Sequence, residues 1–185
     1  AELPACGAHF AENAAAAAGA CHLLGLSPDE IASGLGAATL PDQRFCCVQA
    51  GCWNVVDDTY NANPLSMRRS VEAARLLAGE GQLVLVLGDM RELGQDAAQA
   101  HQNLGAVIKA ANPSAVFFQG EYAPQVASGA QGVPVTAVTQ ADQVLAALAK
   151  LEAGGVILVK GSRSCHMEAY AKALMENLST TGARA

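Results

Sequence analysis

Short apolar runs alternate with helix-forming segments along most of this chain, and this alternation constrains the fold more than any other feature. The apolar runs lie at residues 83–87, 115–118, 133–137 and 156–159. Helices are predicted around them, at 64–78, 96–111, 122–128, 141–151 and 164–178. Most runs are continuously apolar rather than alternating, which is typical of parallel strands covered on both faces. Right-handed crossovers between such strands predict a Rossmann-like, doubly wound α/β fold with a mostly parallel sheet.

Two further β-type runs, at 45–49 and 53–56, precede this alternation and are separated by Ala50-Gly51-Cys52. Their spacing predicts an initial β-hairpin, which brings the expected sheet to about six strands.

The first part of the chain has a different character. Residues 13–24 are nearly all strong helix formers, with Gly25 as a stop signal. Ser27 as N-cap, Pro28 at the first helical position and Glu30 in a capping box predict a second helix at 31–35. Both helices present a thin apolar face and would not fold alone. We therefore expect residues 1–43 to be the incomplete helical end of another domain, and 44–185 to form a domain of their own.

Composition excludes several classes of protein. Hydrophobic residues make up 51% of the 185 and charged residues 15%, which excludes a disordered segment. The net charge of −6 argues against a nucleic-acid partner. No apolar run approaches the roughly 20 residues of a membrane span, and we expect no secretory signal. The six cysteines form no C-x-x-C pair, so we expect reduced thiols and a cytoplasmic location.

Polar residues gather where the predicted strands end, which is the edge at which such sheets bind ligands. The segments that follow three of the strands contain Asp57, Asp58, Tyr60, Asn61 and Asn63, then Asp89, Arg91 and Glu92, then Lys160, Ser162 and Arg163. This edge is the predicted chemical face of the domain.

The loop after residue 159 has the features of an anion site. Gly161 would let the backbone approach a ligand, and the start of the next helix offers free N–H groups. Arg163 can clamp a carboxylate with two hydrogen bonds, and Lys160 adds a point charge. The alternative is an ordinary turn with solvated charges.

Asp57 and Asp58 are adjacent on an extended chain and point in opposite directions, so a catalytic carboxylate pair is disfavoured. One of them is expected to face a ligand such as a ribose, and the other to cap or remain solvated. Asn61 and Asn63 are either ligand contacts or turn residues before Pro64.

The sequence leaves the roles of other candidate binding residues open. Asp89, Arg91 and Glu92 can bind a ligand or pair with one another. His9 is either a ligand or a residue of a helix start. No G-x-x-x-x-G-K-[ST] motif is present, so the chain has no P-loop of its own, and no metal-ligand spacing is found.

Three strings occur in a fixed order along the chain. They are Asp57-Asp58-Thr59-Tyr60-Asn61-Ala62-Asn63-Pro64 with Ser66-Met67, then Leu87-Gly88-Asp89-Met90-x-Glu92-Leu93-Gly94, then Val159-Lys160-Gly161-Ser162-Arg163-Ser164 with Met167-Glu168. Together they resemble the Mur ligases of peptidoglycan synthesis. The segment Gly7-Ala8-His9-Phe10-Ala11-Glu12-Asn13 resembles the family's G-x-H-N-x-x-N, with Phe10 in place of the first Asn.

The resemblance implies an activity. ATP, with Mg²⁺, would phosphorylate the terminal carboxylate of UDP-N-acetylmuramoyl-tripeptide, and the amine of D-alanyl-D-alanine would attack the acyl phosphate. This chain would be the third domain of such a ligase, preceded by the last helices of its central ATPase domain. The amino-terminal domain and the P-loop part of the central domain would lie outside it, so the chain alone is expected to be inactive.

The resemblance also implies roles for individual residues. Asn13, Arg44, Asp58 and His9 would contact ATP, with Asp58 on the ribose and Arg44 near phosphate. Tyr60, Asn61, Asn63, Asp89 and Ser162 would line the cleft or hold the dipeptide, and Lys160 and Arg163 would lie at the reacting centre. No metal ligand is expected within this chain.

Two alternatives remain from the sequence. One is a sibling Mur or folylpolyglutamate-type ligase that adds a different amino acid. The other is a non-catalytic α/β module that binds a nucleotide or a protein partner through the same loops.

Overall fold

The computed structural model describes residues 3, 8–39 and 41–181, and the chain divides into two compact units, Ala1–Asp42 and Gln43–Ala185. That the first unit is part of a separate, incomplete domain stays a prediction.

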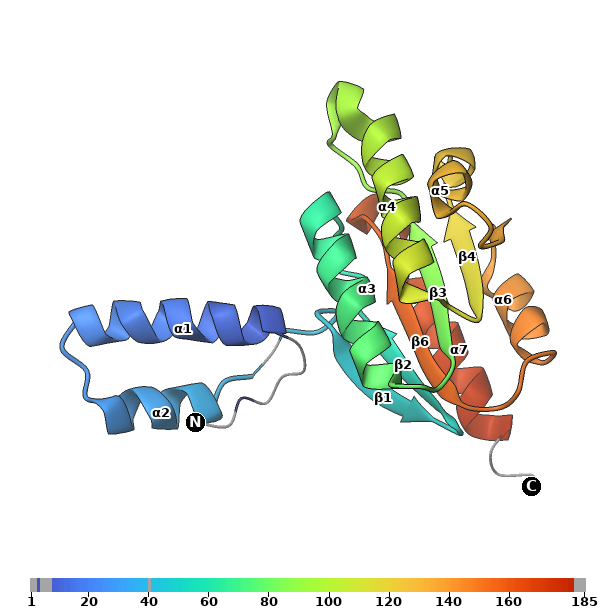
Figure 1. The fold of residues 1–185 in the computed structure, drawn as a ribbon. Helices are drawn as coiled ribbons and strands as arrows, with labels where there is room; N and C mark the ends of the chain where they lie inside the picture. The colour runs from blue at the N-terminus through green and yellow to red at the C-terminus, as the bar shows by residue number, and fades with distance from the viewer. Residues whose placement is uncertain (1–2, 4–7, 40, 182–185) are drawn as a thin grey trace. The chain divides into compact units, whose positions relative to one another are not determined.

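The first unit is a pair of helices, α1 (Ala8–Leu23) and α2 (Pro28–Gly36), which lie side by side (Figure 1). The predicted capping box begins α2: Glu30 N–H donates to Ser27 Oγ, and Ser27 N–H donates to Glu30 Oε2 over 2.8 Å. None of the described side chains of this unit is buried, and Leu23 is 88% exposed. The pair of helices therefore has no buried core of its own among the described residues.

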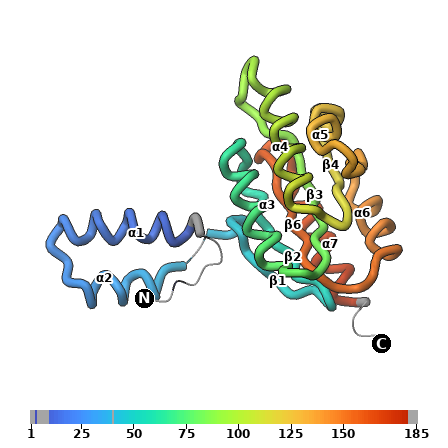
Figure 2. The backbone as a smooth tube through the Cα atoms, in the orientation of Figure 1, coloured from blue at the N-terminus to red at the C-terminus, as the bar shows by residue number. Residues whose placement is uncertain are grey.

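The second unit is an α/β domain, traced as a tube in Figure 2. Its strands are β1 (Cys46–Ala50), β2 (Trp53–Asp57), β3 (Leu83–Gly88), β4 (Ala115–Gln119), β5 (Val135–Ala137) and β6 (Gly155–Lys160). Its α-helices are α3 (Pro64–Ala78), α4 (Ala97–Ala111), α5 (Ala123–Ala130), α6 (Ala141–Leu148) and α7 (Glu168–Thr181), and the 3₁₀ turns are η1 (Gly94–Asp96) and η2 (Arg163–Cys165).

The six strands form one sheet in the order β1-β2-β6-β3-β4-β5. β1 pairs with β2 antiparallel as the predicted hairpin, and every other neighbour is parallel. The predicted Rossmann-like, mostly parallel sheet is confirmed. Because β6 lies between β2 and β3, the loops that follow these three strands meet at one edge.

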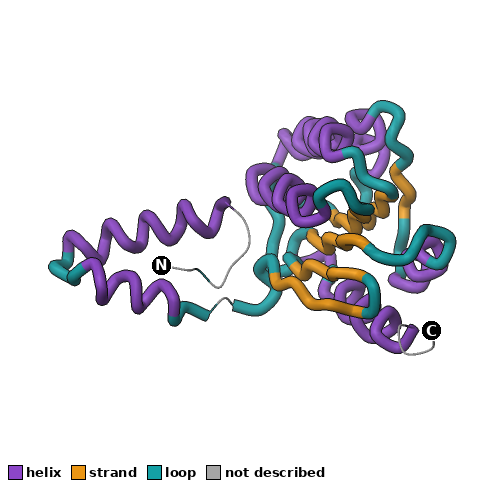
Figure 3. The backbone as a smooth tube through the Cα atoms, turned by 60° about the horizontal axis from the view of Figure 1, so that its bottom comes forward, coloured by secondary structure: helices purple, strands orange, loops and turns teal. Residues whose placement is uncertain are grey.

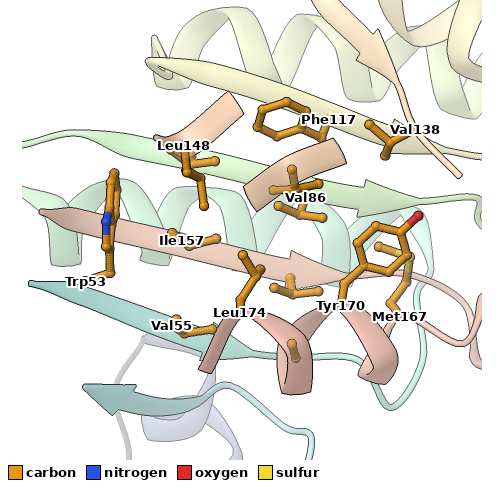
Figure 4. Packing of buried hydrophobic residues seen from close by; sticks show 14 of the residues in the cluster. Trp53, Val55, Val86, Phe117, Val138, Leu148, Ile157, Met167, Tyr170 and Leu174 are labelled. Atoms are coloured by element: carbon orange, nitrogen blue, oxygen red, sulfur yellow. The ribbon is translucent and has the colours of Figure 1, made fainter. Parts of the chain in front are cut away.

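Helices cover both faces of the sheet, as Figure 3 shows. α7 packs against β1, β2 and β6, with α6 beside it, while α3 packs against β3 and β6, and α4 contacts both α3 and α5. Figure 4 shows the first of these interfaces, where Val55, Val86 and Ile157 of the sheet face Leu174 of α7. Burying each such side chain stabilises the fold by about 1.5–3 kcal/mol relative to leaving it in water.

Several predicted helix bounds are wrong. The helix expected at 13–24 begins already at Ala8, and the helix expected at 122–128 runs to Ala130. The helix expected at 164–178 begins only at Glu168, because His166 takes a left-handed conformation with φ of 52° after the turn η2. The helix expected at 141–151 ends at Leu148. Within the described residues, no helix combines the length and apolar character that a membrane crossing requires.

Candidate functional site

The loop after β2 begins with two aspartates that do different things. Asp57 Oδ1 accepts hydrogen bonds from the Thr59 N–H (3.1 Å) and from Thr59 Oγ1 (2.6 Å). Burial raises the pKa of Asp57, against the lowering effect of these two hydrogen bonds. Asp57 therefore fixes the turn, as was expected of one of the pair.

Asp58 points away from Asp57 and into a polar cluster. Its Oδ2 lies 2.7 Å from Nζ of Lys160, at the end of β6, and also accepts a 2.5 Å hydrogen bond from Ser70 Oγ of α3. Its Oδ1 accepts a 3.1 Å hydrogen bond from the Phe45 N–H. Both oxygens are thus bound by protein groups, and the side chain is only 14% exposed.

Lys160 is correspondingly enclosed, at 2% exposure. Its ammonium also donates to the Asn61 carbonyl oxygen over 2.9 Å. Burial lowers the pKa of Lys160, the nearby Arg44 charge lowers it further, and Asp58 opposes both. The ammonium therefore ties the loop after β2 to β6 rather than projecting toward solvent.

Asn63 is the N-cap of α3. Its Oδ1 accepts from the Ser66 N–H over 2.8 Å, and the Asn63 N–H donates to Ser66 Oγ over 3.0 Å. Pro64 takes the first helical position. In this structure the amide oxygen of Asn63 therefore serves the turn before α3, which was one of the two interpretations of this residue.

The loop after β6 is packed against the loop after β3. A Cβ on Gly161 would lie 2.6 Å from Cγ of Met167, so the close approach that this glycine allows is to Met167. Ser162, 3% exposed, donates its N–H to the Asp89 carbonyl oxygen over 3.0 Å. Ser162 Oγ accepts from the Arg91 N–H over 2.8 Å. Ser162 thus joins two of the three loops at this edge.

Asp89 lies fully buried beneath the loops. Its carboxylate accepts hydrogen bonds from the N–H groups of Glu121 (3.1 Å) and Tyr122 (3.3 Å), and Arg91 Nη2 lies 3.3 Å away. The loop can close over it only because residue 120 is glycine, with φ of 141° and no room for a Cβ beside the carboxylate. Asp89 and Arg91 therefore pair, as one of the two interpretations of this loop had it.

Tyr60 lies beside two guanidinium groups. The ring centroid is 4.2 Å from Cζ of Arg44 and 5.5 Å from Cζ of Arg163. All three side chains are exposed, and the Tyr60 N–H donates to the Gln43 carbonyl oxygen. Cation–π contacts of this kind hold Arg side chains in place.

A cavity of about 590 Å³ opens where the three loops meet. Its lining consists of Asn61, Ala62, Asn63, Arg91, Glu92, Leu93, Ser162, Arg163, Ser164 and His166. The volume suits a small peptide-like ligand, since such sites range over roughly 300–1,000 Å³. Among the described contacts the Arg163 guanidinium has no carboxylate partner, so it is the group best placed to take a ligand carboxylate.

The structure thus separates the predicted site residues. Asn61, Asn63, Ser162 and Arg163 line the cavity, whereas Lys160, Asp58 and Asp89 lie behind it. Asn13 is exposed on α1, in the other unit. His9 also belongs to α1, but its side chain lies outside the described residues.

Leu93 and His166 line the cavity although sequence reasoning did not select them. His166 follows the signature string Lys160-Gly161-Ser162-Arg163-Ser164 by two positions, and its Nδ1 lies 3.3 Å from Oε1 of Glu168. A further residue that was not selected, His101 of α4, lies under the loop after β3. Nothing in its local sequence marks it.

A magnesium ion has no ligand set in the described part of the chain. No group of three His, Cys, Asp or Glu residues there is arranged to hold a metal. The carboxylate oxygens of Asp58 are already bound by Lys160, Ser70 and Phe45.

Comparison with known proteins agrees with the family resemblance of the three sequence strings. A family model described as "Mur ligase, glutamate ligase domain" matches residues 43–163. The UDP-N-acetylmuramoyl-tripeptide–D-alanyl-D-alanine ligase of Escherichia coli is 37% identical over 95% of this chain and 39% of its own length. The chain spans about 40% of the length of the curated relatives it matches.

Solved structures agree. MurF from Acinetobacter baumannii superposes with a TM-score of 0.84 at 32% identity, over 94% of this chain and 39% of that one. The MurF ligase of Thermotoga maritima, solved in complex with ADP, is 24% identical and shares the fold, with a TM-score of 0.68 over 80% of this chain and 34% of that one. Because the family model covers more than half of the residues, this chain belongs to the Mur ligase family.

Proposed function

We propose that this chain is the carboxy-terminal portion of an ATP-dependent ligase that joins D-alanyl-D-alanine to UDP-N-acetylmuramoyl-tripeptide in peptidoglycan synthesis. Relatives described as ligases of this activity are 32–37% identical over 95% of the chain. The observation that carries the proposal is the cavity at the strand ends, which is lined by an exposed Arg163 that has no carboxylate partner among the described contacts.

The reaction requires two steps. The tripeptide carboxylate attacks the γ-phosphorus of ATP, so that a C(O)O–P bond forms and the bond to ADP breaks. The dipeptide amine then attacks the acyl carbon, a C–N bond forms, phosphate leaves with the C–O electron pair, and the amine nitrogen loses a proton. Binding the dipeptide in a fixed orientation is what this portion would contribute.

Arg163 would bind the terminal carboxylate of the dipeptide through two charge-assisted hydrogen bonds. Tyr60 would hold the guanidinium through its ring face, and Asn61, Asn63 and Ser162 would shape the wall around the dipeptide. Lys160 would act from behind this wall by fixing the backbone of Asn61, over the 2.9 Å contact to its carbonyl oxygen.

The nucleotide side is proposed from the same resemblance. Arg44, exposed beside Tyr60, would lie near phosphate, and Asn13 and His9 would lie nearer the base. Asp58 has three protein hydrogen-bond partners. Since a carboxylate has about four acceptor positions, a ribose hydroxyl could use the one that remains. Mg²⁺ and the remaining ATP contacts would come from other domains of the same protein, which would also cover the exposed helices of the first unit.

A cytoplasmic location is part of the proposal. Cys21, Cys52 and Cys165 are free thiols, which is typical of a reducing compartment.

A second candidate is a sibling ligase that adds glutamate or another amino acid, which the description of the matching family model favours. The two are separated by the amine substrate. We expect the complete protein to release phosphate from ATP in the presence of UDP-N-acetylmuramoyl-tripeptide only when D-alanyl-D-alanine is added, and not with D- or L-glutamate. Turnover with glutamate alone would favour the sibling. Tight nucleotide binding without turnover under any of these conditions would favour a non-catalytic module.

A further inference from the structure

His101 of α4 is a fully buried polar residue that no step above uses. Its Nδ1 lies 2.7 Å from the carbonyl oxygen of Ala97. A carbonyl oxygen only accepts, so Nδ1 must carry the hydrogen. In the neutral ring Nε2 is then an acceptor, and it receives a 2.9 Å hydrogen bond from the Met90 N–H. The tautomer of His101 is thereby fixed, and the 3.9 Å approach of Nε2 to Asp89 Oδ1 is not a hydrogen bond.

Aromatic contacts hold the ring in this orientation. Tyr122 stacks on it with centroids 4.3 Å apart and planes 10° from parallel. Phe118 of β4 meets it edge-on at 6.1 Å. Since Tyr122 belongs to the loop that closes over Asp89, the imidazole lies at the junction of α4, β4 and the loop after β3.

The loop after β3 is held by three consecutive backbone N–H groups, each bound to a different element. Asp89 N–H donates to the Gln119 carbonyl oxygen (3.2 Å), Met90 N–H to His101 Nε2, and Arg91 N–H to Ser162 Oγ. Met90 is 1% exposed, so no water can readily replace the His101 acceptor. Without His101 as its acceptor, the buried Met90 N–H would cost about 1–3 kcal/mol of stability. The loop would reduce this cost by shifting to bring the N–H to another acceptor.

Movement of this loop would change the shape of the ligand cavity, because the loop contributes to its lining. Arg91, Glu92 and Leu93, the residues that follow Met90, line the cavity together with Arg163 and Ser164 from the loop after β6. The position of these three residues therefore depends on the hydrogen bond at Met90.

We propose that His101 is a positioning residue for the incoming amine substrate, acting through the Met90 N–H to set the wall formed by Arg91, Glu92 and Leu93. The inference rests on the proposed ligase function. His101 touches neither substrate nor reacting atoms. A change at His101 is expected to affect the binding of the amine substrate. It is not expected to affect the binding of ATP, because none of the three residues of this wall is proposed to contact ATP.

The test uses the complete ligase with three variants at one position and one control. His101→Phe keeps an aromatic ring against Tyr122 but removes the acceptor. His101→Gln keeps an oxygen able to accept from Met90. His101→Asn is polar but too short to reach Met90, and serves if the Phe variant does not fold. Gln102→Ala, at the next and exposed position of α4, is the control.

We expect His101→Phe to raise the KM for D-alanyl-D-alanine by roughly tenfold while the KM for ATP stays within about twofold. His101→Gln should restore most of the loss, and Gln102→Ala should behave as wild type. Hydrogen exchange gives a readout that does not depend on activity. The amides of residues 88–93 should exchange faster in the Phe variant, and at the wild-type rate in the Gln variant.

Two results would overturn the proposal. If exchange at 88–93 accelerates but both KM values stay unchanged, His101 only stabilises the fold. If the KM for ATP rises as much as that for the dipeptide, the effect is general and not one of positioning. Absence of dipeptide-dependent turnover in the wild type would instead refute the proposed function, while the exchange data would still show whether His101 fixes the loop.

Discussion

Lys160 and Asp58 come from segments about a hundred positions apart, and their charged atoms lie 2.7 Å from each other behind the strand-end cavity. The two side chains are 3% and 14% exposed. The contact joins β6 to the loop after β2 and, through Ser70, to α3. This contact makes Lys160 a structural support for the site, and leaves Arg163 as the exposed charge of the Lys160-Gly161-Ser162-Arg163 string.

We expect Lys160→Met to lower the free energy of unfolding by about 3 kcal/mol, because Asp58 is left charged in a poorly solvated place. Adding Asp58→Leu should recover part of that loss, which a double-mutant cycle from urea denaturation measures. Lys172→Met, which removes an exposed pair with Glu176 at 3.9 Å, is the control and should change stability by less than about 0.5 kcal/mol. An equally small effect at Lys160 would contradict the interpretation of a buried ion pair.

Asp57 supports a prediction on pH. Burial raises the pKa of Asp57 in the folded state above its ordinary value of 3.8. The folded state then holds the proton more tightly than the unfolded state, so this group's contribution is fully present below pH 3.8 and is lost as pH rises through the folded pKa. Asp57→Asn keeps an oxygen for both Thr59 hydrogen bonds and carries no charge.

The Asn variant should therefore have a higher urea midpoint than wild type at pH 7, and the difference should vanish below pH 3.8. A midpoint that is lower at pH 7 would mean that the charged carboxylate is needed to hold Thr59.

The sequence predicts those parts of this structure that depend on local rules. The capping box of Ser27 and Glu30 forms as expected, because it needs only residues three apart. The apolar runs at 83–87, 115–118 and 156–159 form buried parallel strands, whereas β5, from the run at 133–137, is partly exposed at the edge of the sheet. The polar segments that follow β2, β3 and β6 do meet at one edge. The late start of α7 was not predictable, since the left-handed turn at His166 has no glycine to mark it.

What the sequence does not reveal is which of the polar groups at that edge face a ligand. Asp89 and Arg163 follow strands in the same way, yet one is fully buried and the other exposed. The difference arises because Gly120, in the loop after β4, lets that loop close over Asp89. Such a contact between distant loops is a property of the tertiary structure. His101 was missed for the same reason.

Gly120 allows a direct test of this closure. A Cβ there would lie 2.2 Å from Cγ of Asp89, whereas a Cβ on Gly132 would meet nothing within 4 Å. Both glycines have positive φ, at 141° and 95°. Gly132→Ala should therefore cost only the backbone strain, about 1–2 kcal/mol, and Gly120→Ala clearly more. Equal losses in urea denaturation would show that the loop can open without disturbing Asp89.

Substitutions of Tyr60 can distinguish a role of its ring from a role of its hydroxyl. If its ring holds Arg44 and Arg163, Tyr60→Phe keeps the ring face and should retain most of the activity, while Tyr60→Leu should lose about tenfold in kcat/KM. If its hydroxyl binds substrate, the Phe variant should fall as far as the Leu variant. Steady-state kinetics of the complete ligase with both variants distinguishes the two.

Arg163→Ala tests the centre of the proposed site. Loss of a charge-assisted, bidentate contact should raise the KM for D-alanyl-D-alanine or lower kcat by on the order of tenfold to a thousandfold. Arg163→Lys should recover only part of the loss, because an ammonium cannot reproduce the planar pair of donors. Arg68→Ala, an exposed arginine on α3, removes the same charge away from the cavity and should leave the kinetics unchanged. Because Arg163 is exposed and its described contacts include no carboxylate, the variant should unfold at the same urea concentration as the wild type. Wild-type kinetics in the Arg163→Ala ligase would remove this residue from the site and transfer the carboxylate-binding role to Arg91, the other arginine that lines the cavity.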